Sequence, residues 1–170
     1  TSPPYLNAID YMRGHKLSLV WLGKKVKALR DIRSSNIGTE LSNDSRKDEP
    51  YIEKILSRMT TVSSLQNKHK GMLARYVRDM DRVVSEIHRV LVPGGKATFV
   101  VGDSTLKGVF IRNSSAIRAL AMQHEFSFSS QSTREIPAGR RYLPPPTARD
   151  AGTQFQARMR EEVILTFSKN

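Results

Sequence analysis

The strongest apolar pattern in the chain lies within residues 64–91. Apolar side chains follow one another there at intervals of one, three or four residues, which places them on one face of an α-helix. The residues of this face are Leu73, Tyr76, Val77, Met80, Val83, Val84, Ile87 and Leu91. Val92-Pro93-Gly94-Gly95 comes next and cannot continue a helix. The pattern therefore predicts a long amphipathic helix that ends at a turn.

Weaker periodic patterns predict four further helices. They cover residues 6–23, 24–32, 51–60 and 113–124. Asn113 or Ser114 is the candidate N-cap of the last one. Residues 33–50 are rich in Ser, Asn, Asp and Gly and have no apolar period, so we predict a loop there. We expect Trp21, near the end of the first helix, to be a core residue.

Three segments predict β-strands. Residues 96–101 are apolar enough for a buried strand, and residues 125–133 alternate between apolar and polar side chains. Residues 162–168 form the third. No helical pattern separates the last two strands, so we expect them to pair antiparallel. A helix that leads into a buried strand through a Pro-Gly-Gly turn is typical of α/β proteins, and we assign the chain to that fold class.

Composition excludes several classes of protein. The chain has 170 residues, which suits one domain, and it has no cysteine. Structural disulfides, thiolate metal sites and cysteine nucleophiles are therefore excluded, and a reducing cytoplasm is the location we expect. No apolar run is long enough to cross a membrane. The histidines lack metal-ligand spacing, so we expect no metal site.

The charge balance points to a polyanionic partner. Lys and Arg number 28 against 16 Asp and Glu, which gives a formal net charge of +12. Such an excess favours contact with nucleic-acid phosphates whatever the base sequence. Residues 134–160 form a long basic segment and hold six arginines against Glu135 and Asp150. We therefore expect nucleic acid as the partner and no membrane.

Ser2-Pro3-Pro4-Tyr5 is the motif with the clearest chemistry. Two prolines fix the backbone and remove two N–H donors, so the turn presents carbonyl oxygens without competing donors. The Ser2 hydroxyl adds another acceptor, and Tyr5 adds an aromatic face on which a base can stack. Acceptors aimed at the hydrogens of an exocyclic amine favour its tetrahedral form and stabilise positive charge that develops on the nitrogen.

This motif resembles the catalytic motif of S-adenosylmethionine-dependent amino-methyltransferases that act on DNA, and its first residue is most similar to the cytosine-N4 branch. The segment that ends in Pro93-Gly94-Gly95, with the strand after it, resembles the part of that family before the fifth strand of a Rossmann-like sheet. Residues 7–11 also resemble the sequence that follows the catalytic turn. The resemblance implies that Ser2 and the Pro3 carbonyl hold the target amine while Tyr5 stacks on an extruded or unpaired base.

The chain departs from that family at the cofactor site. Its sequence contains no Phe-x-Gly-x-Gly loop, the family's element for binding S-adenosylmethionine. We therefore expect residues 1–170 to be one half-domain, comprising strands five to seven with flanking helices, that is inactive alone. Strand 96–101 then lacks its usual neighbour. We expect a missing half-domain, a second copy or the helix 6–23 to cover this edge.

Further residues are candidates for substrate binding. Asp10 follows the motif by one to two helical turns, and the others lie in the predicted loop or the basic segment. The candidates are Asp10, Arg33, Asn36, Arg134, Arg140 and Arg141. The family places polar residues near the active cleft after the fifth strand, which makes Asp103 a weaker candidate.

Two alternatives to a DNA methyltransferase follow from the same residues. Related motifs serve RNA bases and protein glutamine side chains, although Ser2 and the basic charge favour a nucleic acid over glutamine. The second alternative is a non-catalytic subunit that binds nucleic acid and completes a partner.

Overall fold

The computed structural model describes residues 1–6, 11–35, 37, 50–106, 108–137 and 161–170. Its main sheet has three antiparallel strands in the order β1–β5–β4. The strands are β1 (Lys96–Gly102), β4 (Phe126–Glu135) and β5 (Glu161–Lys169). The predicted antiparallel pairing of the last two strands is confirmed, with Phe128 opposite Phe167 and Arg134 opposite Glu162.

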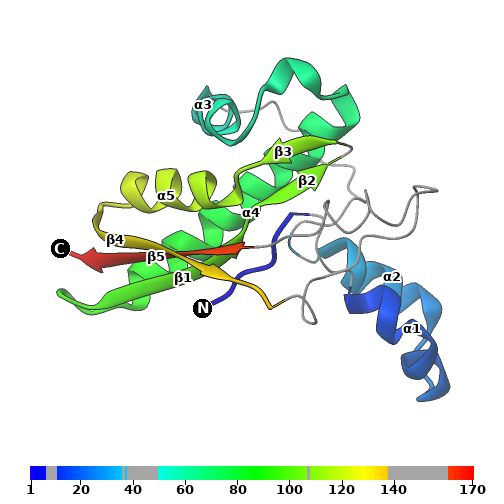
Figure 1. Ribbon diagram of the computed structural model, residues 1–170. Coiled ribbons are helices and arrows are strands. Elements are labelled where there is room, and N and C mark those ends of the chain that lie inside the picture. The colour runs from blue at the N-terminus through cyan, green and yellow to red at the C-terminus, as the bar shows by residue number, and fades with distance from the viewer. Residues whose placement is uncertain (7–10, 36, 38–49, 107, 138–160) are drawn as a thin grey trace.

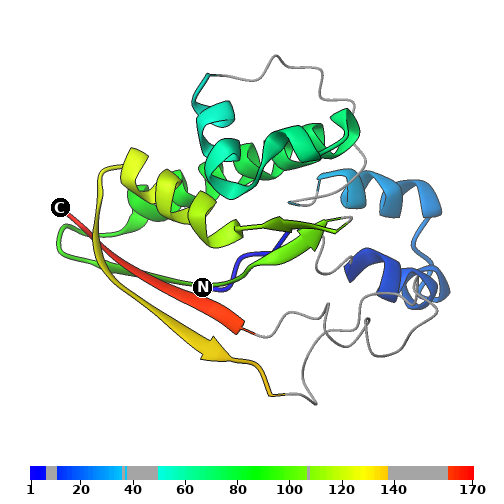
Figure 2. The same cartoon turned by 45° about the horizontal axis from the view of Figure 1, so that its top comes forward.

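Helices cover one face of this sheet (Figure 2). They are α4 (Asn67–Val90) and α5 (Asn113–Gln123), and α3 (Pro50–Met59) packs against both. Ala97, Phe99 and Val101 of β1 are buried under the helices, whereas Lys96 and Thr98, which alternate with them, are exposed. This alternation is the period of a strand with one covered face.

The core is built from the apolar face of α4 and an aromatic cluster on the sheet. The Phe167 ring contacts those of Phe99, Phe126 and Phe128 at centroid distances of 6.0, 6.2 and 5.8 Å. The buried positions of α4 are Leu73, Ala74, Tyr76, Val77, Met80 and Val84. The predicted helix is confirmed, but it begins at Asn67 because Val62–Ser64 forms a separate 3₁₀ turn, η1.

The turn before β1 depends on its glycines. Gly94 has a φ of +76°, a conformation that L-residues with a side chain rarely adopt. At Gly95, an added Cβ would lie 2.8 Å from the Val92 carbonyl oxygen, which is closer than a side-chain carbon approaches backbone oxygen. The Pro-Gly-Gly turn thus reverses the chain tightly from α4 into β1.

Several sequence predictions need correction. Within the described residues the expected helix over residues 6–23 is α1, Tyr11–Trp21, and Leu6 lies in a turn with its side chain buried in the core. The basic helix is α2, Val26–Ser35, which extends past the predicted end at residue 32. Trp21 is 93% exposed, so its prediction as a core residue is wrong. The exposure of Trp21 has a physical reason, because helical periodicity does not report whether another element lies against the apolar side chains.

The segment after β1 folds into a hairpin that the sequence pattern did not indicate. It consists of β2 (Ser104–Leu106) and β3 (Val109–Ile111), which pair antiparallel around Gly108 at φ +83°. Strands of three residues are too short to give a period.

The predicted N-cap of α5 is also wrong. Asn113 is fully buried and donates to the Gly102 carbonyl at 2.9 Å, so it does not cap its own helix. Asp103 does so instead, accepting from the Ser114 N–H at 2.9 Å and from its hydroxyl at 3.1 Å. A carboxylate from outside the helix therefore satisfies its first turn. No helix in the described part of the chain is long and apolar enough to cross a membrane.

Candidate active site

Thr1 lies along the edge of β1 that does not pair with β5. Its nitrogen donates to the Thr98 carbonyl at 2.9 Å, and its carbonyl accepts from the Val100 N–H at 3.0 Å. Two bonds from one residue to the neighbours of Phe99 are the pattern of a parallel ladder. Part of the edge is thus covered by the chain's own residues 1 and 2. The expectation that helix 6–23 covers it is wrong.

This pairing sets the position of the motif. Thr1 runs parallel to β1, so Ser2-Pro3-Pro4-Tyr5 leaves the sheet at the carboxyl end of that strand (Figure 1). Ligands of open α/β sheets bind at the carboxyl ends of the strands.

Apolar anchors hold the turn from both sides. Pro3 is buried and Leu6 is completely buried in the core. Between them, Pro4 is exposed and Tyr5 is partly buried, and Ser2 just before them is exposed. Because the anchors alternate with exposed residues, the turn is fixed to the protein while Ser2 and Pro4 remain exposed. It is neither sealed in the core nor detached from it.

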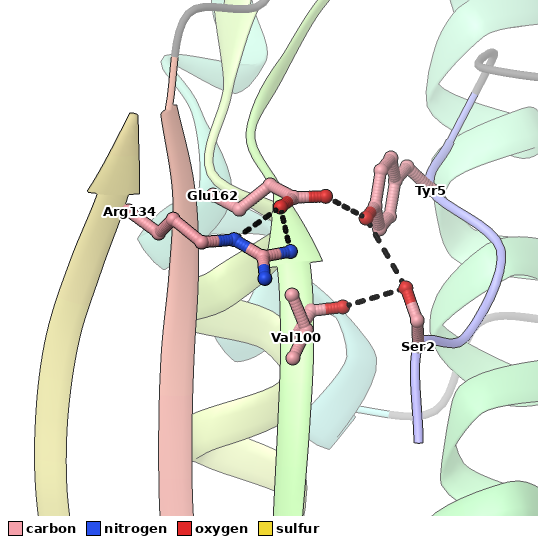
Figure 3. Close-up of polar contacts among 5 residues, drawn as sticks. All are labelled: Ser2, Tyr5, Val100, Arg134 and Glu162. Carbon is pink, nitrogen blue, oxygen red and sulfur yellow. Dashed lines mark hydrogen bonds and ion pairs between the residues drawn. The ribbon is translucent and has the colours of Figure 1, made fainter. Parts of the chain in front are cut away.

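A chain of polar contacts links the motif to the sheet (Figure 3). The Ser2 hydroxyl donates to the Val100 carbonyl at 3.1 Å and lies 3.2 Å from the Tyr5 hydroxyl. The Tyr5 hydroxyl donates to Glu162 Oε1 at 2.9 Å. Arg134 binds the other carboxylate oxygen through Nε at 3.1 Å and also through Nη2. Segments far apart in sequence therefore meet at the motif.

The hydrogen bonds that Glu162 accepts keep its carboxyl group ionised. Burial raises the pKa of the Glu162 carboxyl, but hydrogen bonds from Arg134 and Tyr5 outweigh burial, so its pKa lies below the ordinary value. For Tyr5, burial raises the phenol pKa and the neighbouring Glu162 carboxylate raises it further, whereas the nearby Ser2 hydroxyl lowers it. An ionised acceptor beside a protonated phenol fixes the direction of the Tyr5 hydrogen bond.

The motif retains oxygen atoms that can accept further hydrogen bonds. Since the Ser2 proton is directed to Val100, the lone pairs of its oxygen can accept a hydrogen from a ligand. Among the described residues, none donates a hydrogen bond to the carbonyl of Pro3 or Pro4. The motif can thus present several oxygens to an amine, beside a Tyr5 ring whose hydroxyl is anchored.

The predicted substrate-binding residues have different positions. Arg134 lies close to the motif, but its guanidinium is paired with Glu162. Arg33 lies in the last turn of α2, and no described contact joins it to the motif. Asp103 is engaged in capping α5. The remaining candidates, Asp10, Asn36, Arg140 and Arg141, lie outside the described residues.

Glu162 is the site residue that the sequence did not reveal. It is the second residue of β5, 157 positions from Tyr5, and its side chain is 15% exposed. An acidic residue at the start of a strand carries no recognisable signal. Only the antiparallel pairing of β5 with both β1 and β4 brings it between Tyr5 and Arg134.

The described residues do not fit a site for S-adenosylmethionine. An open depression lies between the end of α3 and the β2–β3 hairpin, where Arg58, Phe110 and Arg112 line it, and no motif residue contributes to its wall. The glycines of the described chain lie in turns and helices and, in the case of Gly102, at the end of β1, and no two of them form a Gly-x-Gly loop after a strand. We therefore assign no cofactor-binding residue in this chain.

Comparison with known proteins gives one relative among curated sequences. The chain is 27% identical over 141 residues to the type II methyltransferase M.BsoBI of Geobacillus stearothermophilus. The match covers 65% of this chain and 27% of M.BsoBI, so the chain spans about a quarter of that relative's length. No family model matches the chain.

Solved structures give weaker matches. TTHA0409 of Thermus thermophilus, a proposed DNA modification methylase, matches in its complex with S-adenosyl-L-methionine. The TM-score is 0.44 at 19% identity, over 69% of this chain and 50% of that one. Its selenomethionine derivative matches with a TM-score of 0.40 at 23% identity, over 55% and 36% of the two chains.

Proposed function

We propose that this chain forms the amine-binding part of a DNA methyltransferase. The reaction is transfer of a methyl group from S-adenosylmethionine to the exocyclic amino group of a base, with cytosine-N4 preferred. One observation carries the proposal. The Ser2 hydroxyl and the Tyr5 ring lie together, accessible, at the carboxyl end of β1 on a turn anchored by Pro3 and Leu6.

The chemistry of a base amine explains why this geometry is suitable. The lone pair of the amine is delocalised into the ring, so the nitrogen is a poor nucleophile. Hydrogen bonds from the amine to Ser2 and to the Pro3 carbonyl favour a tetrahedral nitrogen and stabilise the positive charge that develops on it. Stacking on Tyr5 holds an extruded base, an interaction worth about 1–3 kcal/mol.

Glu162 acts as a positioning residue in this proposal. It accepts the Tyr5 hydrogen bond at 2.9 Å and so fixes the tilt of the ring on which the base stacks. Arg134 acts indirectly, because its hydrogen bond to Glu162 holds in place the carboxylate that orients Tyr5. This role replaces the direct substrate contact that the sequence suggested for Arg134.

The similarity to M.BsoBI, a type II methyltransferase, supports the reaction class. The specific base is supported only by Ser2 at the first position of the motif. Because the described residues form no cofactor site, we propose that this chain is a half-domain and that the rest of a larger methyltransferase supplies that site and the opposite wall of the base pocket.

Methylation by the complete protein that carries this chain tests the proposal. With labelled S-adenosylmethionine and DNA, the product should be N4-methylcytosine on mass spectrometry of the hydrolysed bases.

Ser2→Ala should lower the rate of methylation about 100-fold, as loss of one preorganised polar contact does in other enzymes. Tyr5→Ala should weaken binding of DNA with an extruded base and leave cofactor affinity unchanged. N6-methyladenine as the product would overturn the preferred base, and methylation of matched RNA alone would overturn the substrate.

The absence of a Gly-rich loop from the sequence favours a second candidate, a non-catalytic subunit that binds nucleic acid. Titration with labelled cofactor separates the two functions. A complete protein that binds DNA but neither binds nor consumes S-adenosylmethionine would be such a subunit.

A further inference from the structure

Exposed apolar side chains gather on the two helices that follow the motif. Of the ten large apolar side chains exposed in the described chain, six lie between residues 17 and 32. Trp21 is 93% exposed, Leu17 84% and Leu22 74%. In both views α1 and α2 lie beside each other at one end of the molecule, apart from α3 and α5 (Figures 1 and 2). Such a concentration marks an interaction surface.

The turn between these helices holds Trp21 in a defined place. The Gly23 N–H donates to the Val20 carbonyl at 2.9 Å, and the Lys24 N–H donates to the Leu19 carbonyl at 3.0 Å. With Gly23 at φ +80°, these two bonds form a Schellman motif that ends α1 at Trp21. The exposed indole is therefore attached to a fixed turn.

Positive charge surrounds the same turn. Residues 11–35 contain seven Lys and Arg residues and one acidic residue, Asp31. Lys24, Lys25 and Lys27 are exposed, and within the described part of the chain none of them forms an ion pair. Three uncompensated ammonium groups thus lie within six residues of an exposed indole.

We propose that this turn, residues 21–27, binds unpaired nucleic acid, with Trp21 stacked on a base and Lys24, Lys25 and Lys27 on phosphates. An aromatic ring flanked by cations is the combination that binds single strands without sequence preference. A second copy of the chain fits this surface less well, because two such turns would bring their lysines together. The surface is separate from Ser2 and Tyr5 and does not depend on methyl transfer.

Trp21 also provides the measurement, because it is the only tryptophan in the chain. Addition of a single-stranded oligonucleotide to the 170-residue chain should quench its fluorescence. Trp21→Ala should weaken binding about tenfold by fluorescence anisotropy, and Trp21→Phe should retain most of the affinity. Changing Lys24, Lys25 and Lys27 to Gln together should lower the slope of log affinity against log salt by roughly two.

A matched control uses cations on α3 and α4. Lys54→Gln, Arg58→Gln and Lys68→Gln combined remove the same charge from exposed positions on a different part of the molecule. Met122→Ala, 52% exposed on α5, is the apolar control. Both should bind nearly as tightly as the parent chain. If the charge control loses as much affinity as the triple lysine variant, the effect is general charge and the proposal is wrong.

Other ligands of the turn at residues 21–27 would give different outcomes in these experiments. A duplex with an extrahelical base should quench Trp21 more than a fully paired duplex. Binding to vesicles of anionic lipid but not to oligonucleotide would overturn the proposal in favour of a membrane surface. A dimer in sedimentation that Trp21→Ala abolishes, with emission unchanged by oligonucleotide, would overturn it in favour of self-association. All these measurements are made without methyl transfer, so failure of this site and failure of the proposed function are distinguishable.

Discussion

α4 and α1 both contain large apolar side chains but place them in opposite environments. In α4 these side chains recur on one face of the helix, whereas in α1 they gather in the last turns without forming a single face. In α4 the side chains of Leu73, Met80 and Val84 are at most 1% exposed, whereas in α1 Leu17 and Trp21 are more than four-fifths exposed. The difference lies in what faces each helix, since α4 packs against α3 and α5 while α1 contacts chiefly α2. An apolar stripe therefore contributes to stability only where the fold supplies a surface for it.

The largest expected effect tests this contrast with one substitution at two sites. Leu73→Ala should lower the free energy of unfolding by about 2–5 kcal/mol, because it leaves a cavity in a closely packed core. Leu17→Ala should change it by less than about 0.5 kcal/mol. Urea denaturation of both variants provides the comparison. Similar losses would mean that α1 is packed against the protein in solution.

Asp103, just after the end of β1, is a polar residue that contributes to the stability of the fold. Asp103→Ala should lower the free energy of unfolding by about 1 kcal/mol through loss of the α5 cap. Asp103→Asn keeps an acceptor oxygen and should cost less. Thermal unfolding measures both. If methylation by the complete protein falls far more than stability does, Asp103 belongs to the active site instead.

Glu162 should produce a smaller effect that depends on pH. Its pKa in the folded chain lies below the ordinary value of 4.5, because hydrogen bonds from Arg134 and Tyr5 outweigh burial. The carboxylate therefore stabilises the fold above about pH 4.5, and this contribution is lost as pH falls through the folded pKa. Wild type should exceed Glu162→Gln in stability at pH 7, and the two should converge in acid. A constant difference across this range would contradict the assigned ion pair.

The smallest effect is expected at Tyr76. Its buried hydroxyl has no hydrogen-bond partner in the described part of the chain, and burial raises the pKa of this phenol. Tyr76→Phe should leave stability within about 1 kcal/mol of wild type, in the stabilising direction. Tyr5→Phe is the matched control, because it removes a hydroxyl that has partners, and it should destabilise. A clear loss at Tyr76 would reveal a partner in solution.

Sequence patterns located most elements and part of the candidate site. The α4 face, the Pro-Gly-Gly turn, β1, α5 and the antiparallel last strands follow from periods long enough to recognise. The β2–β3 hairpin, the cap from Asp103 and the contact of Tyr5 with Glu162 do not. Each of these depends on residues that approach one another only after the chain has folded.

The amino-acid sequence by itself determined the local chemistry of the Ser2–Tyr5 motif. A turn with two prolines, a serine and a tyrosine has the same rigidity and the same acceptors wherever it lies, because those properties are local. Only the tertiary structure decided which side chains contact one another and which remain exposed. Parallel pairing of Thr1 with β1 places the motif at the carboxyl end of that strand, and β5 brings Glu162 to Tyr5. The same packing that buries α4 leaves Trp21 exposed, because burial depends on distant segments that no local pattern encodes.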